Sequence, residues 1–423
     1  MTPFLQLALA LAVIIAAAKA AGYLSYRLGQ PSVLGELLVG VLLGPSVIDL
    51  LHLAYFTDSH LPDVIHEMAE MGVLLLMFIA GLDLHLSDLA KTGKVSVFSG
   101  VLGVVFPMAL GVAVGLLASM ELGAAVFLGL VLSATSVSIS AQTLMEMRVL
   151  RSRVGYGLLG AAVFDDILVI LGLSIFSAMA ISDSGAGLGD IIVIILRMIL
   201  FLGGATVIGM LVLPKFSRRI AGLPISQGLV AFTIVIILLF GWGAEEWGRM
   251  AAITGAFMAG LVFSRSSVKE RIETGISALA YGMFVPIFFI DVGLKADIRQ
   301  IGGSALIFFL GMTLAAIIGK VLGAGLGASL GGFSRRESLQ LGIGMMSRGE
   351  VGLIAASLGI TQGLITQEIF SAMVGMVVVT TLLTPPLLRL AFRPSQPPKK
   401  PDAPIVSDSS GISTLTDPTL DGG

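Results

Sequence analysis

Long apolar runs, separated by short polar stretches, recur through the first 392 residues of the chain. A helix of about 20 apolar residues crosses a hydrocarbon layer about 30 Å thick, and a spanning segment must satisfy its own backbone hydrogen bonds, which excludes open strands. The runs therefore predict an all-α polytopic membrane protein with about thirteen transmembrane helices. Their expected ranges are 3–27, 33–51, 63–86, 94–118, 122–146, 153–180, 188–213, 224–242, 247–265, 272–293, 304–331, 337–360 and 366–391.

Composition supports this fold class and excludes several classes of function. Hydrophobic residues make up 56% of the chain and charged residues 12%. The mean hydropathy is +1.00, which lies outside the range of soluble domains. The absence of cysteine excludes disulfides, thiolate metal sites and thiol nucleophiles. A net charge of -2 predicts no nucleic-acid partner. The four histidines form no metal-binding or catalytic motif, so we expect neither an enzyme nor a bound cofactor; they are His52, His60, His66 and His85.

Positive charges in the loops predict the orientation of the helices, because lysine and arginine are enriched in cytoplasmic loops. One set of alternate loops, together with the C-terminal segment, contains Arg27, Lys91, Lys94, Arg148, Arg151, Arg153, Lys215, Arg218, Arg219, Arg265, Lys269, Arg271, Arg335, Arg336, Arg389, Arg393, Lys399 and Lys400. The other set contains only Arg249, Lys295 and Arg299. We therefore expect the N-terminus outside and the C-terminus inside. Residues 393–423 have too little apolar surface to fold and are predicted to be a disordered cytoplasmic tail.

Ionisable residues inside the predicted helices are candidates for function, because a charge within a membrane costs at least about 2.5 kcal/mol on insertion scales. They are Lys19, Glu36, Glu67, Glu70, Asp83, Asp165, Asp166, Arg197, Asp291, Lys320, Arg348 and Glu350. Five of them lie toward helix ends, where solvation at the membrane surface explains them: Lys19, Glu67, Glu70, Asp83 and Asp291.

Two adjacent acids, Asp165 and Asp166, lie near the middle of their predicted helix. Consecutive helical residues point about 100° apart, so one carboxylate can face a water-filled cavity while the other faces a neighbouring helix. Lys320 reaches a similar depth from the opposite side, and the glycines beside it, Gly319 and Gly323, allow another helix to approach closely. The alternatives are that the acids only join helices through hydrogen bonds and that Lys320 extends toward the cytoplasm.

Two of the predicted helices contain polar interruptions. Residues 133–140, SATSVSIS, interrupt the helix 122–146, and Arg348, Gly349 and Glu350 interrupt the helix 337–360. These helices run in opposite directions, which is the pattern of an inverted repeat whose crossed broken helices meet at the midplane and offer freed carbonyl groups to a cation. The alternative is a local Arg348–Glu350 ion pair that only holds its own helix together.

These segments carry a family resemblance. QPSVLGELLVGVLLGPSV and EMGVLLLMFIAGLDL come first, followed by SATSVS, AAVFDDILVILG, IIGKVLGAGLG and MMSRGEVGLI. As an ordered set, the chain resembles the bacterial monovalent cation:proton antiporter-2 family over residues 20–390. The resemblance implies a multi-pass protein of the bacterial cytoplasmic (inner) membrane. It also implies a homodimer, whose transporter domain, residues 1–392, has dimerisation and core subdomains and alternates in an elevator-like manner.

The resemblance further implies roles for single residues. Asp166 carries the ion, and Asp165 pairs with Lys320. An aspartate pair favours the electrogenic sodium/proton branch, since electroneutral relatives usually have asparagine, and potassium-efflux relatives glutamine, before the second aspartate. Asp166 is expected to be the main ligand of the cation, with oxygens also contributed by Asp165, Thr135 and Ser136. Arg348 and Glu350, with Lys320, are expected to balance charge.

Charge competition gives a mechanism. A carboxylate in a low-dielectric cavity holds either a proton or a hard cation such as Na⁺, Li⁺ or K⁺, whose lost water is replaced by oxygen ligands. The expected function is therefore exchange of a monovalent cation for protons by alternating access, in contact with membrane lipid. The alternatives are a potassium/proton efflux system, a gated cation channel that would leave a pH gradient undisturbed, and sodium-coupled uptake of an organic anion, for which Arg348 is the only candidate anchor.

Overall fold

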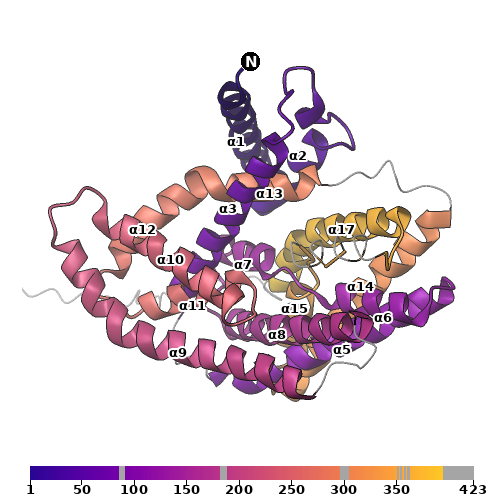
Figure 1. Ribbon diagram of the computed structural model, residues 1–423. Helices are drawn as coiled ribbons and strands as arrows, with labels where there is room; N and C mark the ends of the chain where they lie inside the picture. The colour runs from indigo at the N-terminus through magenta and orange to yellow at the C-terminus, as the bar shows by residue number, and fades with distance from the viewer. Residues whose placement is uncertain are drawn as a thin grey trace, which may run out of the picture.

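The computed structural model of the protein describes residues 1–84, 91–181, 188–295, 304–349, 352, 355–356, 359 and 363–393. This part of the chain is built from helices and contains no strand (Figure 1), which confirms the predicted all-α class. The elements are α1 (Pro3–Arg27), α2 (Ser32–Leu43), η1 (Leu50–His52), α3 (Leu61–Asp83), α5 (Gly93–Leu117), α6 (Leu122–Ser133), α7 (Val137–Glu146), α8 (Arg153–Ile181), α9 (Leu188–Ala221), α10 (Gly228–Glu246), α11 (Ala252–Phe263), α12 (Lys269–Leu279), η2 (Ala280–Phe284), α13 (Val285–Leu294), α14 (Ser304–Leu330), α15 (Arg335–Gly344) and α17 (Gln367–Phe392).

Ten helical stretches in the described residues are long and apolar enough to cross a membrane, and α2 and α11 are shorter apolar helices. Each coincides with a predicted span. α2 ends at Leu43, earlier than predicted, where a glycine and a proline follow it. α9 extends to Ala221, beyond the predicted end at residue 213. Pro214 lies inside this helix and does not end it. The remaining predicted span, 337–360, overlaps α15, which begins at Arg335, and falls largely outside the described residues after Gly349.

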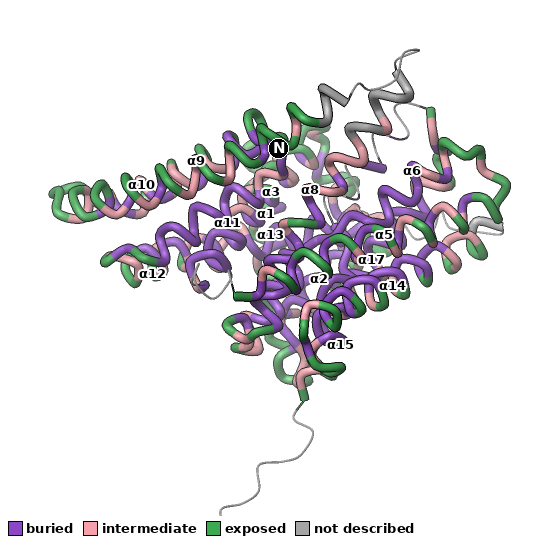
Figure 2. The backbone as a smooth tube through the Cα atoms, turned by 90° about the horizontal axis from the view of Figure 1, so that it is seen from below, coloured by how far each residue is buried: buried purple, intermediate pink, exposed green. Residues whose placement is uncertain are grey.

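The helices pack in two groups (Figure 1). The first helix group consists of α1, α2, α3, α10, α11, α12 and α13, and the second helix group of α5, α6, α7, α8, α14, α15 and α17. α9 packs against α10 and α11 and follows α8 in the chain. Figure 2 shows exposed residues along the outer faces of α9 and α10. The exposed side chains on α9 include Leu196, Leu200 and Leu211, as expected for a surface in contact with lipid.

Glycines let helices within each group approach closely. In the first helix group, a β-carbon on Gly40 of α2 would lie 2.6 Å from the Ile290 carbonyl oxygen of α13. In the second, a β-carbon on Gly319 of α14 would lie 2.6 Å from Pro107 Cα of α5. Small residues serve this purpose in membranes, where apolar surface alone does not drive helices together. The close approach predicted beside Lys320 is therefore confirmed, and its partner is α5.

The two broken helices meet, as predicted from their polar interruptions. The Ser136 amide, in the unwound stretch between α6 and α7, donates to the Ser347 carbonyl oxygen at 3.0 Å. Ser347 Oγ donates to the Ser136 carbonyl oxygen at 2.6 Å, and Ser140 Oγ to the Gly344 carbonyl oxygen at 2.5 Å. Unwound backbone is tolerated at membrane depth only where such bonds satisfy it.

A further irregularity was not predicted. The segment expected as one helix over 272–293 contains a π-helical turn, η2, between α12 and α13. Pro286 stands at the start of α13 and has no amide proton to donate to the preceding turn. A wider turn accommodates this loss, but hydropathy gives no sign of it.

Candidate functional site

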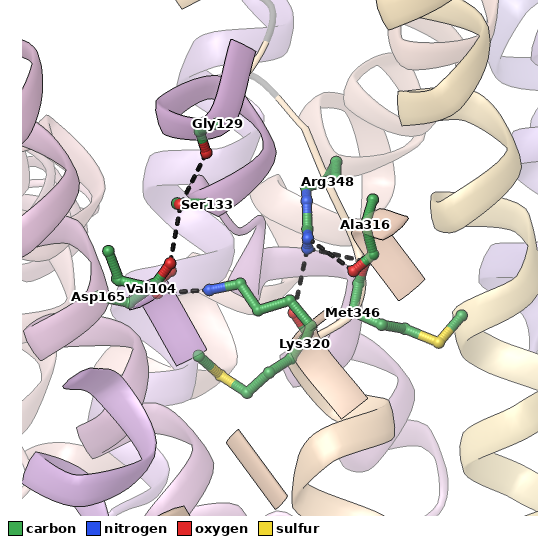
Figure 3. A network of polar contacts seen from close by, with 9 residues as sticks. Val104, Gly129, Ser133, Asp165, Ala316, Lys320, Met346 and Arg348 are labelled. Atoms are coloured by element: carbon green, nitrogen blue, oxygen red, sulfur yellow. Dashed lines mark hydrogen bonds and ion pairs between the residues drawn. The ribbon is translucent and has the colours of Figure 1, made fainter. Parts of the chain in front are cut away.

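Asp165 forms an ion pair with Lys320, which reaches it from α14 (Figure 3). Both side chains are completely buried, so each charge depends on the other for compensation. Thr135, in the unwound stretch after α6, lies beside the same carboxylate. The expected contact between Asp165 and a lysine at matching depth is thus present in the structure.

Asp166 faces a different neighbour. It borders a cavity of about 10 Å³, which is about the volume that one water molecule or an ion of similar size needs. Thr254 of α11 lies in the same cavity wall and donates a hydrogen bond of 3.3 Å from Oγ1 to Asp166 Oδ2. The other described lining residues are apolar: Met77, Val137, Leu159, Ala162, Val163, Ile253 and Phe257. The structure thus places Asp166 at a cavity and Asp165 against a neighbouring helix. That this cavity is filled with water stays a prediction.

Arg348 lies in the unwound stretch after α15 and is completely buried. Its Nη1 donates to the carbonyl oxygens of Met345 at 3.3 Å and Met346 at 3.0 Å, and Nη2 donates to the carbonyl oxygen of Ala316 in α14 at 3.0 Å (Figure 3). Thr381 of α17 donates to the Arg348 carbonyl oxygen at 2.6 Å. The guanidinium thereby donates hydrogen bonds to carbonyl oxygens at the C-terminal end of α15, and it links this end to α14.

The first interruption is secured by bonds to the backbone and between hydroxyls, and the Ser136 Oγ lies 2.9 Å from the Ser138 Oγ. Ser133 Oγ lies 3.0 Å from the Val104 carbonyl oxygen and 2.9 Å from that of Gly129 (Figure 3). Ser136 takes part in the crossing of the broken helices through its own main chain. The role of Thr135 and Ser136 as cation ligands stays a prediction. Glu350, expected to balance charge or to pair with Arg348, lies outside the described residues.

A larger cavity of about 190 Å³, here called the vestibule, lies between α3, α10, α11 and α13. Its charged or titratable lining residues are His66, Glu70, Glu245, Asp291 and Lys295. Ile253 of α11 lines both the vestibule and the cavity at Asp166, so the two adjoin at this helix. The vestibule lies at the ends of helices that the loop charges predict to be outside.

Asp291 in the vestibule belongs to a polar cluster. Its Oδ2 lies 3.0 Å from His66 Nδ1 and 3.1 Å from Lys295 Nζ, and this ammonium lies 2.8 Å from the same His66 nitrogen. Glu70 Oε1 is 3.4 Å from His66 Nε2. The explanation of Asp291 by solvation at a helix end is therefore wrong: its side chain is 9% exposed and is stabilised by two partners.

At the opposite ends of the helices, polar contacts join the two helix groups. Glu146 of α7 accepts hydrogen bonds from the Ser32 amide at 2.6 Å and from Ser32 Oγ at 2.5 Å, at the beginning of α2. Arg151, in the loop after α7, forms an ion pair of 2.8 Å with Asp83 at the end of α3. The hydrogen bond from Arg151 to this carboxylate raises the pKa of the guanidinium above its ordinary value. The loop charges predict this side to be cytoplasmic.

The model of the family described as "Sodium/hydrogen exchanger, transmembrane" matches residues 10–391. The chain belongs to this family. The resemblance inferred from the ordered motifs is thereby confirmed. Membership of the exchanger family agrees with the crossed broken helices and with a buried acid, Asp166, between the two helix groups.

Two bacterial relatives match the chain over most of their length. The chain is 40% identical over 382 residues to the Na(+)/H(+)-K(+) antiporter GerN of Bacillus cereus, covering 90% of this chain and 95% of that protein. It is 34% identical over 380 residues to the Na(+)/H(+) antiporter of Enterococcus hirae, covering 90% and 96%. Among solved structures, the sodium proton antiporter MjNhaP1 from Methanocaldococcus jannaschii has a TM-score of 0.64 at 16% identity, covering 92% of this chain and 99% of that one. At this identity the similarity concerns the fold alone.

Sequence reasoning missed two features of the site region. Thr254 carries no charge and is the single hydroxyl residue in an apolar run. The sequence therefore contained no signal that Thr254 lies beside Asp166. The cluster of His66, Asp291 and Lys295 joins α3 to α13 across more than 200 residues of sequence. The spacing of Asp291 and Lys295, one helical turn apart, was the signal that could have suggested an ion pair.

Proposed function

We propose that the protein exchanges a monovalent cation for protons by alternating access and that Asp166 holds either ion. The observation that carries the proposal is a buried carboxylate at a cavity of about 10 Å³, next to an acid that a lysine already compensates. The names of the relatives support Na⁺ as the cation and K⁺ as an alternative. Li⁺ is a further alternative, because a carboxylate site suits any hard monovalent cation. The chain is a multi-pass protein of a bacterial membrane, and we place it in the cytoplasmic membrane.

The charges of the buried groups explain why the two ions exclude each other. Asp165 and Asp166 bring two negative charges, and Lys320 and Arg348 bring two positive charges, so these four groups balance when the site is empty. A proton or a cation at Asp166 each adds one positive charge. Adding both would place two uncompensated charges in a region of low dielectric constant, where each is costly. The site therefore holds one ion at a time.

The ion pair of Asp165 and Lys320 supports electrogenic exchange. A cation at Asp166 adds positive charge close to the Lys320 ammonium, and loss of a proton from that ammonium restores the balance. The cation that binds then displaces one proton at Asp166 and a second at Lys320. More than one proton moves for each cation, and the cycle transfers net charge.

The position of Asp166 between the two helix groups supports alternating access. Asp166 belongs to the second helix group. Part of the cavity wall belongs to the first helix group and is formed by Met77, Thr254 and Phe257. The vestibule adjoins this cavity from one side, and the bonds between Glu146 and Ser32 join the groups on the other. A cation reaches the other side when the second group moves relative to the first. We assign the second group to the core subdomain and the first to the dimerisation subdomain of a homodimer.

Purified protein in liposomes tests this function. Addition of Na⁺ to liposomes that hold a pH gradient should dissipate the gradient in proportion to exchange. Asp166→Asn should lower this rate to that of protein-free liposomes, because the amide keeps the shape of the side chain and lacks the charge. Asp63→Asn, at an exposed position in the first turn of α3, serves as the matched control and should retain the wild-type rate.

Two results would contradict the proposal. Near wild-type cation-driven proton movement by folded Asp166→Asn would remove this residue from the mechanism. Rapid cation flux that leaves the pH gradient undisturbed would instead identify a channel.

A further inference from the structure

Thr254 brings a polar group to the ion cavity from the first helix group. Its Oγ1 donates to Asp166 Oδ2 at 3.3 Å, and the residue is 3% exposed. Asp166 and Thr254 are the polar side chains among the described residues that line this cavity. A cation that enters the cavity and loses water therefore meets one carboxylate and one hydroxyl of the lining side chains.

The backbone around Thr254 holds this hydroxyl in place. Gly255, the next residue, packs directly on the backbone of Phe240 in α10. Gly260, further along α11, packs on the backbone of Phe78 in α3. Because α11 is fixed on both sides within the first helix group, the Thr254 hydroxyl does not follow Asp166 when the second group moves.

We infer that Thr254 is a ligand and positioning residue of the ion site that acts only when the site is open to the vestibule. In the empty site its hydroxyl donates to Asp166 and orients the carboxylate. When a cation binds, the hydroxyl turns and its oxygen coordinates the ion, because a hydroxyl has both a proton to donate and lone pairs to offer. When the second group moves, Asp166 leaves Thr254 behind, and the cation is held without this oxygen. This inference rests on the proposed exchange at Asp166.

The side dependence gives a sharp test with isosteric variants. Thr254→Val keeps the shape of the side chain and removes the hydroxyl, whereas Thr254→Ser keeps the hydroxyl. Thr233→Val is the matched control, because Thr233 is a buried threonine of the same helix group whose hydroxyl bonds its own helix at 2.8 Å. The half-maximal Na⁺ concentration for proton movement is measured in right-side-out and in everted membrane vesicles, so that Na⁺ reaches the protein from each side in turn.

With Na⁺ on the vestibule side, Thr254→Val should raise the half-maximal concentration about 3- to 10-fold, the effect of losing one neutral hydrogen-bonding group. With Na⁺ on the other side, the value should remain that of the wild type. Thr254→Ser and Thr233→Val should match the wild type on both sides. If Thr254→Val does not accumulate in the membrane, Thr254→Ala replaces it with the same expectation.

Unchanged values for Thr254→Val on the vestibule side, or an equal increase on both sides, would overturn the inference. Binding without transport gives a second readout. Thermal stabilisation of the purified protein by Na⁺ should require a higher Na⁺ concentration in Thr254→Val than in Thr233→Val, and equal requirements would count against the role. An inactive Asp166→Asn together with wild-type behaviour of Thr254→Val would refute this inference alone, whereas an active Asp166→Asn would refute the proposed function.

Discussion

Asp165 and Asp166 differ in their surroundings because a helix turns by about 100° per residue. Asp165 points to α14 and meets Lys320, whereas Asp166 points to α11 and meets Thr254. The sequence was sufficient to predict the pair, its depth and the lysine, since a charge in an apolar run stands out. It was not sufficient to predict Thr254, because a neutral hydroxyl is cheap to place in a helix, where it can bond its own backbone.

Asp165→Asn should retain some exchange but move less net charge per cation. Without the carboxylate, the charge of buried Lys320 loses its partner, and the lysine stays neutral through the cycle instead of releasing a proton. Reversal potentials in proteoliposomes clamped with a potassium ionophore measure the proton-to-cation ratio. The ratio should fall in Asp165→Asn and remain unchanged in Asp63→Asn. Equal ratios in the wild type and Asp165→Asn would rule out proton release from Lys320.

At the scale of elements, the broken helices owe their stability to side chains that satisfy unwound backbone. Their positions were predictable, because hydroxyls and charges interrupt apolar runs at 133–140 and 348–350. The hydrogen bonds that stabilise the broken helices were not predictable. Arg348 donates to a carbonyl oxygen of its own unwound stretch and to one in α14, and spacing along the chain does not reveal the contact with α14. The π-helical turn η2 and the bonds from Ser32 to Glu146 at the start of α2 likewise depend on tertiary neighbours.

Arg348→Met should destabilise the protein strongly. The methionine leaves carbonyls at the end of α15 and in α14 without their donor, and each buried group left unsatisfied costs about 1–3 kcal/mol. We expect the free energy of unfolding to fall by about 2–4 kcal/mol, measured by denaturant unfolding in detergent. The free energy of unfolding of Arg348→Lys should lie between those of the wild type and Arg348→Met. The lysine ammonium keeps the charge but lacks the planar fork of the guanidinium.

Arg219→Met is the matched control for this substitution, because Arg219 is an exposed arginine in the last turn of α9, beyond the predicted span 188–213. Its free energy of unfolding should stay within about 0.5 kcal/mol of the wild type. If Arg348→Met were as stable as Arg219→Met, the guanidinium would not be holding the broken helix.

At the scale of the whole molecule, hydropathy predicts where helices cross the membrane but not which helices pack together. The division into two groups depends on close contacts such as Gly40 with α13 and Gly319 with α5, which need the three-dimensional neighbours to be seen. The vestibule and the Glu146–Ser32 contact lie at opposite ends of the helices. Which of these ends faces the cytoplasm stays a prediction from the loop charges.

The orientation of the molecule can be tested directly because the chain contains no cysteine. Ser59 lies in the exposed loop before α3 and Ser226 in the exposed loop before α10. Ser59→Cys should react with a membrane-impermeant maleimide in intact cells, and Ser226→Cys only after the cells are permeabilised. The reverse pattern would invert the predicted topology.

The central claim is that a cation and a proton compete for one carboxylate, and the pH dependence of cation affinity tests it most directly. The half-maximal Na⁺ concentration for exchange is measured in proteoliposomes from about pH 5.5 to 8.5, a window that spans the shifts expected of buried carboxylates. Because bound protons exclude the cation, this concentration should rise as the pH falls, by about tenfold per pH unit where the cation displaces only the proton at Asp166, and more steeply where Lys320 also releases a proton. A half-maximal concentration that stays constant across this range would mean that the two ions bind at separate sites and would contradict the claim.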